Sequence, residues 1–98
     1  MEKLKGSAKK QLRALAHHLN PVVMVGRNGV SEQLVASVNA ALKNHELIKV
    51  KFLDFKEEKK EISQEIATVT KSEVVGIIGN IVIFYRQHPQ PEMRKIKI

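Results

Sequence analysis

Apolar and polar positions recur along the chain with two different periods, and these predict an alternation of helices and strands. Ser7 is a predicted N-cap, and Asn20-Pro21 ends the segment because a residue before proline disfavours the helical conformation. Between them the apolar side chains fall on one helical face: Ala8, Leu12, Leu15, Ala16 and Leu19. The wholly apolar run 22–25 that follows predicts a short buried strand.

Two further helices are predicted. Ser31 is the expected cap of the first, which ends at Asn44-His45, and Val30 with Val35 forms a hydrophobic staple at its start. Its apolar face consists of Leu34, Val35, Val38, Ala41 and Leu42. The second of these helices is expected over about 56–70, anchored by Ile62, Ile66 and Val69.

The remaining segments have the pattern of strands. Over 47–53, Ile48, Val50 and Phe52 alternate with Lys49 and Lys51, so one face should be buried and the other at least partly wet. The runs 74–78 and 81–86 flank Gly79-Asn80, a two-residue hairpin turn. The order is α-β-α-β-α-β-β, and we expect an α/β fold: a two-layer domain with a mixed four-stranded sheet, whose buried face is covered by the second and third helices.

The net charge of the chain indicates what kind of partner the protein binds. The chain has 98 residues, 17 Lys and Arg against 10 Asp and Glu, and a net charge of +7, so a polyanionic partner is expected. Residues 1–31 have a net charge of +5 and residues 86–98 of +3, whereas 54–73 has −2. Lysine-rich ends can also serve only solubility. Because the chain has no Cys and no signal-peptide pattern, we expect a cytoplasmic protein without disulfides or a zinc ribbon.

The segment Gly26-Arg27-Asn28-Gly29 is the motif with a physical mechanism. Glycines let backbone N–H groups approach a bound group, and the helix predicted to begin at Ser31 directs its positive end to the same place. Arg27 adds a planar charged donor and Asn28 a neutral one. The motif lacks the Gly-Lys-Ser/Thr of a Walker loop and the third glycine of a dinucleotide fingerprint. It therefore predicts a site for a phosphate in a nucleic-acid backbone.

The sequence gives little support for a catalytic site or a metal site. Asp54 is the chain's single aspartate, and His17, His18, His45 and His88 lack metal-ligand spacing. We expect His17 and His18 to cap helix-end carbonyls or to meet solvent. No catalytic residue, metal or other cofactor is predicted. Phe52 and Phe84 are expected in the core and Tyr85 at its edge, so RNA would be held through its backbone and shape, with little direct base readout.

Three blocks of sequence resemble the CRM domain, named for chloroplast RNA splicing and ribosome maturation. They are 16–30 (AHHLNPVVMVGRNGV), 46–51 (ELIKVK) and 78–86 (IGNIVIFYR). The resemblance covers about residues 7–86, and the length is similar to that of the bacterial stand-alone, YhbY-like members. It implies a fold similar to the C-terminal domain of the third bacterial translation initiation factor. It also implies RNA contact through the Gly-x-x-Gly loop and association with precursors of the large ribosomal subunit.

We therefore interpret residues 1–98 as one RNA-binding domain with a core of about 7–86 and a basic tail, 87–98, that is extended or loose around Pro89 and Pro91. The expected RNA surface consists of Gly26, Arg27, Asn28 and Gly29 with Lys9, Lys10, Arg13, Lys49 and Lys51. The expected partner is ribosomal RNA precursor in the pre-50S particle, met by a monomer, with no membrane and no small-molecule substrate. Sequence-nonspecific DNA binding and a protein–protein adaptor in ribosome assembly remain the alternatives.

Overall fold

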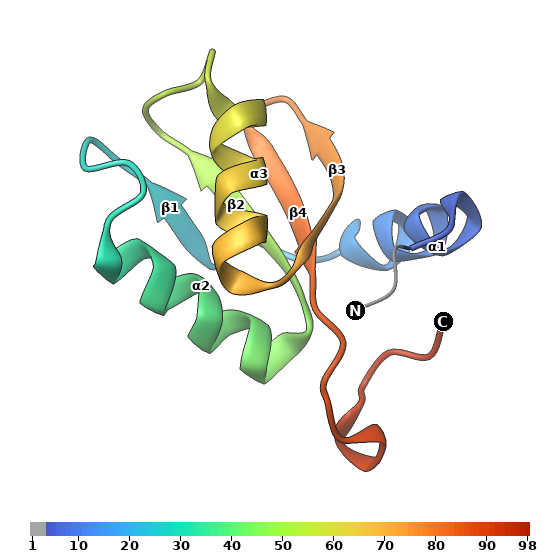
Figure 1. Cartoon of the computed structure of the whole chain (residues 1–98). Coiled ribbons are helices and arrows are strands. Elements are labelled where there is room, and N and C mark those ends of the chain that lie inside the picture. The colour runs from blue at the N-terminus through green and yellow to red at the C-terminus, as the bar shows by residue number, and fades with distance from the viewer. Residues whose placement is uncertain (1–3) are drawn as a thin grey trace.

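The structure is a computed structural model and describes residues 4–98 (Figure 1). Its helices are α1 (Gly6–Ala16), α2 (Glu32–His45) and α3 (Lys59–Thr70), with a 3₁₀ turn η1 (Pro91–Met93). Its strands are β1 (Val23–Val25), β2 (Leu47–Phe52), β3 (Glu73–Ile78) and β4 (Ile81–Tyr85). The predicted element order is confirmed.

The four strands form one mixed sheet in the order β1-β2-β4-β3. β1 pairs with β2 in parallel, with Met24 opposite Lys51, whereas β4 is antiparallel to both β2 and β3. The hairpin turns at Gly79-Asn80 as predicted, and Gly79 has φ +58°, a conformation that glycine adopts without strain. The loop after β1 and the hairpin turn therefore lie at the same end of the sheet.

The main core lies between the sheet and the helices α2 and α3 (Figure 1). Ile48, Val50 and Phe52 are buried there, while Lys49 is half-buried and Lys51 is exposed, which confirms the predicted faces of β2. Ser31 caps α2 as predicted, because its Oγ accepts the Leu34 N–H at 3.1 Å.

The inward face of α3 differs from the prediction. Val69 is 51% exposed, and Ser63 and Thr70 are buried instead. Thr70 tolerates burial because its hydroxyl bonds to the Ile66 carbonyl and to Ser72 Oγ, both at 2.7 Å. The helix also begins at Lys59, three residues later than expected.

Helix α1 packs on the opposite face of the sheet, so the expectation of two layers is wrong. Leu12 and Ala16 join a second buried cluster with Leu47, Val75, Ile83 and Tyr85. The alternation along β4 explains the third layer, since Val82 and Phe84 face the main core while Ile83 and Tyr85 face α1.

The ends of α1 and β1 also correct the predictions. Ser7 lies inside α1, and the N-cap is Lys5, which makes no side-chain capping bond. Leu15 and Leu19 are 46% and 38% exposed, because α1 buries the narrower stripe of Leu12 and Ala16. β1 is an edge strand in which Val23 and Val25 are buried as predicted, whereas Met24 on its outward side is 50% exposed.

The C-terminal segment is packed against the domain rather than loose. Glu46, a buried residue with φ +62°, accepts the backbone N–H groups of His88, Lys95 and Ile96. Ile96 also packs against the second cluster. The segment is therefore not loose, because a buried carboxylate fixes its backbone, while Gln90 and Arg94 on either side of η1 have the extended conformation that was expected.

Arg86 belongs to the fold rather than to a free basic surface. Its Nη1 donates to Asn39 Oδ1 at 2.7 Å and to the Thr70 carbonyl at 2.9 Å, and its Nη2 donates to the Asn39 carbonyl at 3.1 Å. Partial burial lowers the pKa of this guanidinium from its ordinary value. Arg86 thus ties α2 to the end of α3. None of the helices within residues 4–98 has the length and apolar content needed to cross a membrane.

Candidate functional site

The loop between β1 and α2 is a closed turn. The Gly29 N–H donates to the Gly26 carbonyl at 3.0 Å, and the Ser31 N–H donates to the Gly29 carbonyl at 3.1 Å. Gly29 has φ +59°, in the left-handed region that favours glycine, so this position explains one of the two glycines of the motif. At the tip, Arg27 and Asn28 are exposed.

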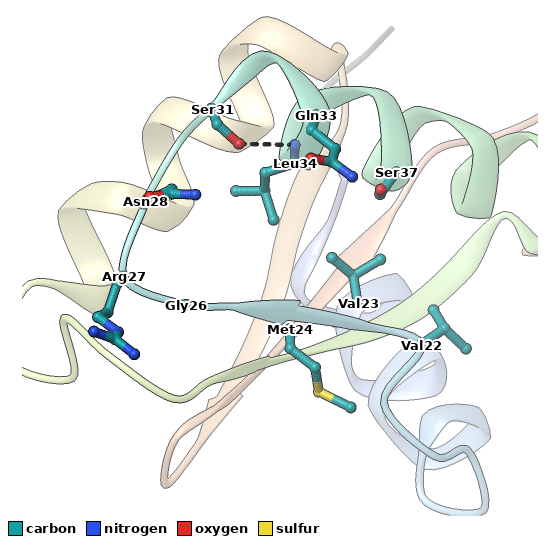
Figure 2. A pocket seen from close by; sticks show the side chains of 11 residues that line it. Val22, Val23, Met24, Gly26, Arg27, Asn28, Ser31, Gln33, Leu34 and Ser37 are labelled. Carbon is teal, nitrogen blue, oxygen red and sulfur yellow. Dashed lines mark hydrogen bonds between the residues drawn. The ribbon is translucent and has the colours of Figure 1, made fainter.

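The N-terminus of α2 opens directly beside this turn. Figure 2 shows the bond from Ser31 Oγ to the Leu34 N–H, which sets the start of the helix. The N–H groups of Glu32 and Gln33 precede the first helical hydrogen bond and form the positive end of the helix dipole. The turn and the helix end therefore offer donors to one region of space.

A shallow hollow of about 330 Å³ lies between the loop, β1 and the first turns of α2 (Figure 2). Loop residues 26–29 form one side, and Gln33 and Ser37 of α2 provide polar side chains on the other. In Figure 2, Arg27 extends away from α2, while Gln33 and Ser37 lie along the helix face that borders the hollow. The hollow is small, lies beside the N-terminus of α2, and is lined in part by polar side chains and the loop backbone, which suits a phosphate group.

Lys51 is the predicted cation nearest to this loop along the sheet. It is exposed, and its partner across the parallel ladder is Met24, two residues before Gly26. Lys49 stands one pleat farther from the loop, half-buried, and its Nζ donates to the Leu19 carbonyl at 3.0 Å. The structure therefore gives Lys49 a structural bond that charge alone did not predict.

The cations of α1 form a separate group. Leu12 and Ala16 pack against Leu47 and Tyr85, at the end of the sheet opposite the loop. Lys10 is exposed and Lys9 half-buried on this helix. The predicted RNA surface thus has two parts, one at the loop and one on α1, which packs on the sheet face opposite α2 and α3.

Arg13 is held by the fold. Its Nη1 donates to the Val75 carbonyl at 2.9 Å, and its side chain crosses Gly76, where a β-carbon would lie 2.8 Å from Arg13 Cδ. Gly76 is opposite Ile83, at the irregular register that follows Val74 in β3. Arg13 therefore ties α1 to the sheet, and Gly76 leaves room for it.

Sequence reasoning missed Phe55, which borders the loop. A β-carbon on Gly29 would lie 3.4 Å from Phe55 Cε2, so the ring rests against the loop backbone. Phe55 follows β2 in a charged stretch without apolar periodicity, so the periodic pattern did not indicate it. A lone aromatic residue among charges was the available signal.

The histidines contribute no assembled site. His17 and His18 are both exposed at the end of α1, with ring centroids 5.4 Å apart in an edge-to-face arrangement. Within residues 4–98, acidic and histidine side chains form no group of three that could hold a metal ion.

Comparison with known proteins gives a consistent match. The sequence model of the CRS1/YhbY (CRM) domain matches residues 4–86. An RNA-binding protein of Haemophilus influenzae is 42% identical over 95 residues, which cover 96% of both chains. A probable RNA-binding protein of Pseudomonas aeruginosa is 38% identical over 84 residues, covering 85% of this chain and 81% of the relative.

A solved structure agrees with the fold. The solution structure of a hypothetical protein from Staphylococcus aureus superposes with a TM-score of 0.80 at 32% sequence identity. The match covers 97% of this chain and 100% of the other. The mixed four-stranded sheet with three helices is therefore shared with an independently determined structure.

Proposed function

The chain belongs to the CRS1/YhbY (CRM) domain family, and from this membership we propose that it is a non-catalytic, cytoplasmic RNA-binding protein. We propose further that its RNA is a ribosomal RNA precursor and that it acts in assembly of the large ribosomal subunit. The observation that carries the proposal is the Gly26–Gly29 turn, which lies directly before a capped helix and has Arg27 and Asn28 exposed at its tip.

The phosphate would be held mainly by backbone groups. The loop and the first turn of α2 present N–H donors, and the helix dipole favours a negative charge there. Arg27 can add a paired, charge-assisted hydrogen bond, and Asn28 a neutral one. Lys51 lies along the sheet from the loop and would meet a neighbouring phosphate.

The sheet itself offers no stacking surface. Phe52, Phe84 and Tyr85 are all fully buried, whereas modules that stack bases on a sheet expose their aromatic residues there. The side chains of four predicted cations make no hydrogen bond within the described residues, namely Lys9, Lys10, Arg27 and Lys51, while the side chains of Arg13 and Lys49 make one each. RNA would therefore be gripped through its backbone at two places, the loop and α1.

The salt dependence of binding tests this mode. About four phosphate contacts to single-stranded RNA give a log–log slope of affinity against salt of roughly −3. A flat dependence would contradict backbone recognition. Duplex DNA of equal length, measured at the same salt concentration, should bind more weakly, and tighter DNA binding would favour the DNA alternative.

The cellular RNA is tested by crosslinking the protein to RNA in living cells and sequencing what is attached. We expect precursor RNA of the large subunit to predominate for the unchanged protein and to be lost for Arg27→Ala. A flat spread over messenger RNA would contradict the ribosomal part of the proposal. An association with ribosomal particles that survives nuclease treatment would favour the adaptor instead.

A further inference from the structure

Phe55 is the only phenylalanine or tyrosine side chain that faces solvent within residues 4–98. Its side chain is 40% exposed, whereas Phe52, Phe84 and Tyr85 are each 0% exposed. It lies in the connection between β2 and α3, among charged residues. The ring is thus more than half covered by the protein, and its remaining part is open to solvent.

The backbone of this connection is anchored to the end of β1. The Leu53 and Asp54 N–H groups both donate to the Val25 carbonyl, at 2.9 and 3.2 Å, and Val25 directly precedes Gly26. On the other side, the Glu58 N–H donates to the Phe55 carbonyl at 3.1 Å. The connection is therefore tied to the end of β1 just before Phe55 and closed by a local turn just after it.

The ring is placed against the loop itself. Its Cε2, Cζ and Cδ2 atoms lie 3.4, 3.7 and 4.0 Å from where a Gly29 β-carbon would be, so one edge of the ring faces the bare Gly29 backbone. Phe55 itself has φ +55°, a conformation that non-glycine residues seldom adopt. An unusual backbone conformation thus turns an aromatic ring toward the loop and leaves part of it open to solvent.

We propose that the open part of the Phe55 ring is a stacking site for an unpaired nucleobase of the RNA whose phosphate binds the Gly26–Gly29 loop. The inference rests on the proposed function. Because base and phosphate belong to one nucleotide, a ring in contact with Gly29 is within reach of a base attached to a bound phosphate. Every base has a π-face, so the site would accept any of the four.

This assigns the kind of RNA that the loop accepts. In a regular duplex the bases are stacked on one another and their faces are not available, whereas loops, bulges and single strands present them. The loop would therefore select unpaired RNA, with Phe55 supplying the selection and Arg27 the attraction to phosphate.

The test uses two probes with the full chain: a short single-stranded RNA containing 2-aminopurine, and an abasic ribose-phosphate strand of the same length. Phe55→Leu keeps an apolar side chain against Gly29 but removes the aromatic face, and Phe55→Trp retains one. We expect Phe55→Leu to lose about 10-fold in affinity for the RNA, the effect of one base stack. It should leave binding of the abasic strand unchanged, while Phe55→Trp restores the affinity and quenches 2-aminopurine.

Matched controls separate this inference from the proposed function. Val69→Ala removes a side chain of similar exposure, 51%, on α3 and should change neither binding nor quenching. If the unchanged protein binds RNA and Phe55→Leu binds it equally well, the stacking site is refuted while RNA binding stands. Equal losses on both probes would show that Phe55 only supports the loop, and would also refute it. No binding of either probe by the unchanged protein would refute the proposed function itself.

Discussion

The carboxylate of Glu46 accepts the backbone N–H of Lys95 at 2.6 Å, although the two residues are 49 positions apart in the chain. The same carboxylate accepts the N–H groups of Ile96 at 3.1 Å and His88 at 2.8 Å. Glu46 is 2% exposed, so these bonds are shielded from water. One buried acid thus fixes two separate points of the C-terminal segment, both far from it in sequence.

Replacing Glu46 by Gln should loosen that segment. The amide loses the charge and one acceptor, and hydrogen bonds to a charged group contribute about 1.5–3 kcal/mol, so we expect the free energy of unfolding to fall by about that amount. Amide hydrogen exchange at Lys95 and Ile96 should accelerate. Gln11→Ala, which removes only an exposed bond to the Lys97 carbonyl, should change the unfolding free energy by less than about 0.5 kcal/mol. Unchanged exchange at Lys95 would contradict the assignment.

Arg27→Ala should separate binding from folding. The side chain is exposed at the tip of the turn, so the free energy of unfolding should change by less than about 0.5 kcal/mol. RNA affinity should fall by roughly 1.5–3 kcal/mol, the contribution of a charge-assisted hydrogen bond to phosphate. The control is Lys60→Ala on α3, measured by the same titration. Equal losses for the two variants would mean that only net charge matters.

Gly29→Ala should damage folding and binding together. A left-handed φ of +59° costs an L residue about 1–2 kcal/mol, and the new methyl group would also press on the Phe55 ring. Gly26→Ala is the matched control, because Gly26 has no atom within 4 Å of a β-carbon and no positive φ. Thermal melts of both variants provide the comparison. Equal melting temperatures would show that the turn does not depend on the Gly29 conformation.

Arg86→Met should destabilise the protein without touching the RNA site. The change removes three hydrogen bonds between α2, α3 and the end of β4, and we expect a loss of about 2–4 kcal/mol in the free energy of unfolding. Urea denaturation measures it, and Arg86→Lys should recover only part because a lysine cannot reproduce the planar fork. RNA affinity of the folded fraction should be unchanged, and a strong loss would instead place Arg86 in the interface.

Tyr85→Phe should reduce the loss of folding stability at alkaline pH. Burial, and then the nearby charge of Glu46, raise the pKa of the Tyr85 phenol above its ordinary value of 10.0. At pH above 10.0 the unfolded chain releases this proton while the folded chain keeps it, so stability falls as the pH rises. The variant should lack this part of the loss. Since Tyr85 is the chain's one tyrosine, ultraviolet absorbance follows its titration, and an unshifted transition would contradict the prediction.

At neutral pH the same variant should fold as well or slightly better. The Tyr85 hydroxyl is buried without a hydrogen-bond partner among residues 4–98. Removing an unpaired polar group leaves the unfolding free energy unchanged or raises it by up to about 1 kcal/mol. Urea denaturation near neutral pH decides this, and a clear destabilisation would indicate a partner for the hydroxyl.

Periodic patterns predicted most of the fold. The alternation of Ile48, Val50 and Phe52 with lysines reports directly which face of β2 is buried, because side chains on a strand point to opposite sides in turn. Apolar periodicity did not predict the burial of polar residues that make local hydrogen bonds. Thr70 is an example, because Ser72 and the Ile66 carbonyl satisfy its buried hydroxyl. Apolar periodicity also failed at α1, where one narrow apolar stripe did not reveal which side of the sheet it would cover.

The candidate site was predictable only in part. The glycine turn and the Ser31 cap are encoded within a few neighbouring residues, so local sequence was sufficient for them. The bonds of Arg13 to Val75 and of Lys49 to Leu19 join residues distant in sequence, and charge alone cannot tell such a bound cation from a free one. Phe55 was missed because its own neighbours are charged and without apolar periodicity, and because its partner Gly29 lies on another loop.

The second cluster has a consequence for the order in which the protein is made. The buried residues that Leu12 and Ala16 of α1 pack against all come later in the chain, at Leu47, Val75, Ile83 and Tyr85. An isolated helix of 11 residues is marginal in water, and synthesis supplies those partners last. The basic helix therefore leaves the translating ribosome before its docking surface exists. The packing site of α1 forms only when the C-terminal half of the chain has emerged. The cationic region that α1 carries is therefore positioned last.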